Sequence, residues 1–168
     1  MSQVAELRCR CGEVSGRVDD ASPQTVNRVI CCCDDCQAFS YHLGRADLLD
    51  AQGGSDIVQV APAALSFHRG ADRIVGLRLT PKGPFRWYSS CCNTPLGNTT
   101  GPAVPFVGIV VQGFQNASTD PDALFGKSLA SDPRVALSAD DSVCRRARSP
   151  APLLWPPADG ALIQFQRS

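Results

Sequence analysis

Nine cysteines in 168 residues constrain this chain more than any other feature, and four of them fall between Cys31 and Cys36. That run reads CCCDDC, so Cys33 and Cys36 form a C-x-x-C motif and Cys31 lies two residues before it. An odd number of cysteines cannot all pair within one chain. The cluster is therefore a candidate metal site, redox pair or disulfide knot. Features elsewhere in the sequence favour one of these interpretations over the others.

The N-terminal stretch, the lengths of the apolar runs and the net charge indicate which compartment and which partners to expect. The opening stretch MSQVAELRCRCGEV has no apolar run of signal-peptide length, and no segment approaches the roughly 18 consecutive apolar residues of a membrane span. Sixteen basic residues balance sixteen acidic ones, so no overall field favours nucleic acid or an anionic membrane. We expect a cytoplasmic protein that binds neither, in which thiols stay reduced and clustered cysteines bind metal or react.

Metal binding is the interpretation that we favour for the cluster. The turn of a C-x-x-C lets two sulfurs converge on one ion, and Cys31 shares a strand face with Cys33. Zinc suits such a set of thiolates best. Cys32 is expected to point to the opposite face and to be no ligand.

Two other interpretations compete. A redox C-x-x-C is expected at the start of a helix in a thioredoxin-like chain, whereas this one follows a predicted strand in a β-rich sequence. Buried cysteines often act as small hydrophobic residues, but the cluster is too dense for this to explain all of them.

Alternation and apolar runs predict a β-rich chain. The predicted strands are EVSGRVD from Glu13, TVNRVICC from Thr25, DIVQV from Asp56 and the apolar VPFVGIVVQGF from Val104. RGAD, from Arg69, is predicted to turn a hairpin between one strand with Leu65 and Phe67 and another with Val75, Leu77 and Leu79. Asp120 and Pro121 predict the start of a short helix.

Three motifs together resemble the glutathione-dependent formaldehyde-activating enzyme (GFA) family, which includes the centromere protein V type of domain. They are CRCGEVSG, then CCCDDCQ, then FRWYSSCCNTPL, in the family's order and approximate spacing over residues 7–98. The resemblance implies a mainly β fold of two packed antiparallel sheets over residues 1–112. A short helical and irregular C-terminal extension, residues 113–168, is expected to pack on the same domain.

The resemblance also implies two zinc sites. Cys31, Cys33 and Cys36 would hold a catalytic zinc. Cys9 and Cys11 would hold a structural zinc with two cysteines of the third motif. There the sequence departs from the family pattern, because Cys92 matches the second ligand but Ser89 stands at the first. Either the adjacent Cys91, which we favour, or Cys144 would then complete the set, or the site is weakened or lost.

Two further departures concern the catalytic motif: Cys32 stands where the family has His, and Gln37 where it has Arg. Neither Asp34 nor Asp35 is expected to reach the metal, since side chains inside a C-x-x-C turn point away from it. His42 could close the site. If it does not, a zinc with three thiolates is better suited to hold a substrate thiol than to generate hydroxide.

The activity implied by the resemblance is carbon–sulfur lyase chemistry on a thiol adduct such as S-hydroxymethylglutathione, with glutathione as partner. Four cations are candidates to anchor its carboxylates, although each is more often a solvated strand residue: Arg69, Arg73, Lys82 and Arg86. A non-catalytic, zinc-stabilised protein-interaction module is the alternative. A nucleic-acid-binding zinc ribbon ranks last, since RRAR at Arg145–Arg148 is the only basic run and lies outside the cysteine framework.

Overall fold

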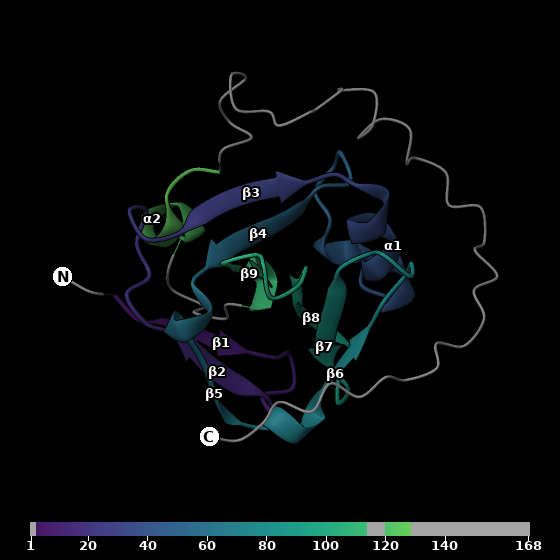
Figure 1. Cartoon of the computed structure of the whole chain (residues 1–168), viewed down its shortest axis with the longest axis horizontal. Helices are drawn as coiled ribbons and strands as arrows, with labels where there is room; N and C mark the ends of the chain where they lie inside the picture. Colours follow the sequence, from purple (N-terminus) through teal and green to yellow (C-terminus); the bar gives the residue numbers. More distant parts are fainter. Residues whose placement is uncertain (1–2, 114–119, 129–168) are drawn as a thin grey trace.

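The fold is that of a computed structural model, which describes residues 3–113 and 120–128. Two antiparallel sheets make up most of it (Figure 1). The small sheet has the order β1 (Ala5–Arg8), β2 (Ser15–Val18), β5 (Leu65–Arg69). The large sheet has the order β3 (Asn27–Cys31), β4 (Ser55–Val60), β9 (Val107–Val110), β8 (Thr94–Thr99), β7 (Phe85–Ser89), β6 (Ile74–Leu77). The mainly β fold class expected from the sequence is confirmed.

The main core lies between the two sheets. Alternation along β2 and the residue before it buries Val14, Gly16 and Val18, as the period-two pattern predicted. From the large sheet, β9 is buried along its whole length, as its apolar run predicted. Phe67 of β5 meets Trp87 of β7 edge to face, with ring centroids 6.0 Å apart, so an aromatic pair joins the two sheets.

The predicted hairpin around RGAD is wrong. β5 pairs with β2 in the small sheet, whereas β6 pairs with β7 in the large one. Gly70 takes a left-handed conformation (φ 68°), and a 3₁₀ turn at Ala71–Arg73 follows. A Cβ at Gly70 would lie 2.2 Å from the Glu13 carbonyl oxygen, so glycine is required where the chain crosses from one sheet to the other.

Helix α1 (Asp34–His42) follows β3 directly and packs on the far edge of the same sheet. Its Phe39 and Leu43 form a second, smaller apolar cluster with Leu77 of β6 and with Leu79, against which Tyr88 of β7 packs. Because β3 and β6 are opposite edges of the six-stranded sheet, α1 brings the end of β3 close to β7 (Figure 1).

The short helix predicted at Asp120 is present as α2 (Pro121–Phe125), and the Asp120 carboxylate accepts a hydrogen bond from the Asp122 amide. Leu124 and Phe125 enter the main core, and the Arg28 guanidinium of β3 bonds both Asp56 and Asp122. This part of the expected extension thus packs on the β domain. Cys144 and the run Arg145–Arg148 lie outside the described residues, as does most of the expected extension.

Candidate metal centres

The structure brings Cys31, Cys33 and Cys36 together at the junction of β3 and α1. The Cys31 sulfur lies 3.0 Å from that of Cys36 and 3.3 Å from that of Cys33. Cys33 is exposed, Cys31 is half-buried and Cys36 is buried, so one side of the group faces solvent. These three cysteines could hold a metal ion.

The local sequence explains why the sulfurs converge. β3 ends at Cys31, Cys33 is the N-cap of α1, and the Cys36 and Gln37 amides both donate to the Cys33 carbonyl oxygen. The C-x-x-C therefore begins a helix. We disfavoured a redox motif because we expected no helix to start there, and that expectation is wrong. A helix start suits thiolates, because its free amides and dipole stabilise negative charge.

The hydrogen bonds within this group concentrate its negative charge on one sulfur. Thiol hydrogen bonds from Cys31 and then Cys36 lower the pKa of Cys33 to about 2, with help from the Cys36 amide and the charge of Arg86. Hydrogen bonds with Cys31 and then Cys33 raise the pKa of Cys36, and hydrogen bonding to Cys33 raises that of Cys31. Without metal, Cys33 is therefore the thiolate and its two neighbours are donors.

Arg86 is buried, whereas we expected an arginine on a strand to be more often solvated. Its side chain points from β7 toward α1 and is 4% exposed, and Nη1 donates to the Cys36 sulfur at 3.5 Å. The guanidinium carbon lies 5.6 Å from the centre of the Phe39 ring. The arginine Nε is buried and has no hydrogen-bond partner among the described residues. A buried cation thus borders the three cysteines.

The other polar residues near the motif do not join the group. Asp34 is exposed in the first turn of α1, and Asp35 lies beside Gly83, where a Cβ would be 3.2 Å from its Oδ2. His42 is exposed in the last turn of α1, about 9 Å along the axis from Cys36. Within residues 3–113 and 120–128, no His, Asp, Glu or further Cys completes the group of three.

Neither Gln37 nor Cys32 belongs to the three-cysteine group. Gln37 is buried, and its amide donates to the Cys32 carbonyl oxygen at 3.1 Å. This bond fixes the turn between β3 and α1. Cys32 is not among the three cysteines that the fold gathers.

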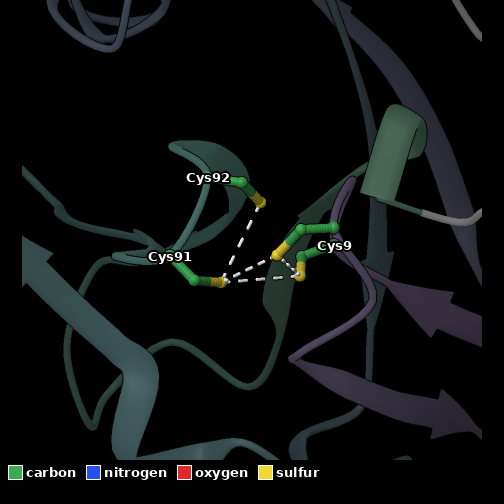
Figure 2. A group of neighbouring side chains, drawn as sticks. Cys9, Cys91 and Cys92 are labelled. Carbon is green, nitrogen blue, oxygen red and sulfur yellow. Dashed lines mark hydrogen bonds between the residues drawn. The ribbon is translucent and has the colours of Figure 1, made fainter.

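A second group contains four cysteines: Cys9, Cys11, Cys91 and Cys92. The first two lie in the loop after β1, and the other two lie in the turn between β7 and β8, so the group joins the two sheets. The sulfurs of Cys9, Cys91 and Cys92 face a common point (Figure 2). Of the two candidates for the fourth position that lie within the described residues, Cys91 is in the group and the Ser89 hydroxyl lies 3.3 Å from the Cys92 sulfur.

Two tight turns aim these sulfurs. Gly12 bonds back to the Cys9 carbonyl oxygen with φ 82°, and the Val14 amide donates to the Cys9 sulfur at 3.2 Å. On the other side, Asn93 is left-handed (φ 54°) and its amide donates to the Ser89 carbonyl oxygen. Each turn thus supplies backbone geometry that points thiols at the same place.

Ser89 supports Cys92 instead of replacing a ligand. Its hydroxyl lies 3.3 Å from the Cys92 sulfur, and that of Thr94 lies 3.1 Å away. Both hydroxyl oxygens accept backbone amides, Ser89 from Thr94 and Thr94 from Arg10, which leaves their protons for the sulfur. Although burial raises the pKa of Cys92, these hydroxyls lower it to about 5. Burial, followed by hydrogen bonds with Cys11 and Cys9, raises the pKa of Cys91 to about 12.

The sulfur separations test whether this set fits a zinc ion. Zinc–sulfur bonds of about 2.3 Å in a tetrahedron require sulfurs about 3.8 Å apart. In the four-cysteine group, the recorded separations are 3.6, 3.8, 3.3 and 4.0 Å. These four separations are close to the tetrahedral value and all four sulfurs lie within 4.8 Å of one another, so the group is compatible with a closed tetrahedral site. The three-cysteine group is tighter, at 3.0 and 3.3 Å, and these separations would open by about 0.5–0.8 Å to hold zinc.

The remaining candidate anchors lie on the surface. Arg69, Arg73 and Lys82 are all exposed, and the first two pair with Glu13 and Asp72 respectively. Lys82 belongs to the loop before β7, next to Gly83 and thus near Asp35 of the C-x-x-C turn. Of the four cations considered from sequence, Arg86 is the one that contacts a cysteine of the three-sulfur group.

The described part of the chain contains no helix long and apolar enough to cross a membrane. Among solved structures, the fold is similar to the crystal structure of a Rhodobacter sphaeroides protein determined in a structural genomics programme. The two share 16% sequence identity with a TM-score of 0.51 over 73% of this chain and 96% of that one. At this identity, the similarity concerns the fold. No curated protein matches the chain.

A family model matches the whole of the β domain and continues beyond it. It covers residues 1–154, which include both cysteine groups. The chain thus belongs to the protein family described as "Family of unknown function (DUF6151)".

Proposed function

We propose that this chain is a zinc protein of two sites and a carbon–sulfur lyase related to the GFA family, which acts on a thiol adduct such as S-hydroxymethylglutathione. The observation that carries the proposal is the difference between the two cysteine groups. Four cysteines fit a closed site, whereas three converge beside α1 with no fourth ligand among the described residues. Three protein ligands and an open position distinguish catalytic zinc sites from structural ones.

Each residue of the three-cysteine group has a defined part in this proposal. Cys31, Cys33 and Cys36 would hold the zinc ion, and the exposed Cys33 leaves one side accessible to a ligand from solvent. A bound zinc would supply a position that takes up the substrate thiol as a thiolate. Gln37 holds the turn between β3 and α1, which keeps the three sulfurs close together before any ligand arrives.

The reaction class follows from the chemistry of a thiolate near a small carbonyl compound. In the forward direction, the substrate sulfur bonds to the carbonyl carbon, and the carbonyl oxygen accepts a proton to become the hydroxyl of the adduct. In the reverse direction, the carbon–sulfur bond breaks and the same proton leaves. The reaction needs no oxidant or reductant.

The four-cysteine group has a structural part. It joins the loop after β1 to the turn after β7, and Cys9 is fully buried in the main core. A zinc ion there would cross-link the two sheets. The same feature favours the second candidate function, a zinc-stabilised interaction module, if the three-cysteine group does not take a substrate.

Exchange NMR would test the proposal. We expect zinc-loaded protein to accelerate the exchange of labelled formaldehyde hydrate with its glutathione adduct at least tenfold over buffer. Cys33→Ala should abolish the acceleration, and Cys32→Ser should keep it, because Cys32 is not in the three-sulfur group. No acceleration by correctly loaded wild-type protein would contradict the lyase and favour the interaction module.

A further inference from the structure

The convergence of the three cysteines does not explain why a buried arginine, Arg86, lies beside them. Arg86 is only 4% exposed and is the second residue of β7. Pairing with Leu77 of β6 and Asn98 of β8 fixes its backbone on both sides. A buried cation needs a compensating anion, because removing an isolated charge from water is very costly.

The compensating charge lies in the cysteine group. The Arg86 Nη1 contacts the Cys36 sulfur at 3.5 Å, and no salt bridge to a carboxylate is recorded for Arg86 within the described residues. Its Nε is buried with its hydrogen unused. The guanidinium thus has donor capacity left beyond the one sulfur contact.

The unused donor capacity of the Arg86 guanidinium matters because of the negative charge that the three-cysteine site carries when a metal ion is bound. A divalent ion with three thiolates carries a net charge near minus one, and a fourth thiolate raises it to minus two. In a partly buried site, that second negative charge is unfavourable unless a fixed cation offsets it. A neutral fourth ligand, such as imidazole or water, adds no charge and needs no such help.

We propose that Arg86 is a positioning residue that makes the three-cysteine site select an anionic thiolate over a neutral molecule as its fourth ligand. The inference rests on the proposed function, because it concerns the ligand that the open position takes. It gives the site a physical basis for binding thiols in competition with water.

Cobalt substitution would test the inference, since the visible bands of cobalt report its fourth ligand. Cobalt-loaded wild-type protein, Arg86→Met and Arg86→Gln would each be titrated with 2-mercaptoethanol and, separately, with imidazole. We expect both neutral variants to bind 2-mercaptoethanol at least tenfold more weakly than wild type, and imidazole within twofold of wild type. Arg86→Lys keeps the charge and should stay within threefold for both probes.

Arg78→Met is the matched control. Arg78, directly after β6, is an exposed cation that stacks on Phe85 of β7, with its guanidinium carbon 3.7 Å from the ring centre. Its loss should change neither titration. Two neutral replacements of Arg86 are included so that one can fail to fold without ending the test, because removing one partner of a buried charge pair is destabilising.

The outcomes separate the inference from the proposed function. Equal weakening of both probes in folded Arg86→Met or Arg86→Gln would show a merely structural role and overturn the inference. Unchanged binding of 2-mercaptoethanol would overturn it too, while the open thiol site would stand. A wild-type spectrum indifferent to 2-mercaptoethanol and to glutathione would contradict the open site and the inference together.

Discussion

Single residues decide what each cysteine can do, even between neighbours in the sequence. Cys31, Cys33 and Cys36 converge, whereas Cys32, between the first two, is not part of the group. The grouping agrees with the prediction but its reason does not, because β3 ends at Cys31 and Cys33 is the N-cap of α1, so strand alternation does not extend across the three residues. The sequence could not place Arg86, because its burial depends on α1 covering that face of β7.

The first prediction at this scale concerns the acidity of Cys33. A pKa lowered to about 2 means that the thiolate persists as the pH falls, whereas an ordinary thiol with a pKa of about 8.5 is protonated. In reduced, metal-free protein, alkylation of Cys33 by iodoacetamide should change less than about twofold between pH 8 and pH 6. Peptide mass spectrometry would measure it.

Free glutathione in the same tube is the internal control for that experiment. Its alkylation should fall roughly a hundredfold over the same range, since the reactive thiolate fraction falls with it. A decrease at Cys33 as steep as that of glutathione would contradict the hydrogen-bonded thiolate.

The second residue-scale prediction concerns Ser89, which is fully buried. Ser89→Ala removes a hydroxyl donor to Cys92 and leaves the Thr94 amide without its acceptor. Leaving a buried donor unsatisfied costs about 1–3 kcal/mol. We expect a decrease of that size in the free energy of unfolding, measured by urea denaturation. Ser90→Ala, on an exposed neighbour, should cost less than half as much.

At the scale of elements, α1 is the part of the site that the sequence analysis missed. Its buried residues Cys36, Phe39, Ser40 and Leu43 follow the i, i+3, i+4, i+7 spacing of an amphipathic helix. Asp34 and Asp35 in its first turn are a further signal. The strand predicted before the motif extended into it, and the helical spacing after it was not recognised. The hairpin prediction was wrong for another reason: turn residues do not show which sheet the next strand joins.

The helix gives an element-scale prediction. Phe39 is 3% exposed and packs against the end of the large sheet, so Phe39→Ala should cost about 3–5 kcal/mol, part of it as loosening of α1. The zinc of the three-cysteine group should then leave faster, at least fivefold, while that of the four-cysteine group is unaffected. Chelator competition with a zinc indicator would resolve the two rates.

Tyr41→Ala is the matched control, since Tyr41 lies on the same helix with 47% of its surface exposed. It should alter neither rate. Equal acceleration of both zinc losses by Phe39→Ala would mean that the two groups are not independent sites.

At the scale of the whole molecule, β7 connects the two cysteine groups from its two faces. Arg86 and Tyr88 face α1, whereas Trp87 enters the core between the sheets and Ser89 supports Cys92. The sequence predicted the mainly β fold of two sheets, and the cysteines that it named as ligands lie together in two groups. The packing of α1 that brings the end of β3 close to β7 depends on long-range contacts, which the local sequence does not show.

The positions of the groups predict unequal effects on stability. The four-cysteine group joins the two sheets, so Cys9→Ser should lower the thermal midpoint by about 10 °C or more in the presence of zinc. Cys33→Ala, in an exposed position at the helix start, should lower it by less than half of that. Circular dichroism melting would compare them, and equal losses would contradict the separate structural role.

The central claim is that the molecule has two separate thiolate metal sites, one of three cysteines and one of four. Native mass spectrometry of zinc-loaded protein tests this most directly by counting ions per chain. The account predicts two zinc ions in wild type, one in Cys33→Ala and one in Cys91→Ala, with two retained in Cys32→Ser. A single ion in wild type, or two in either of the first variants, would contradict it.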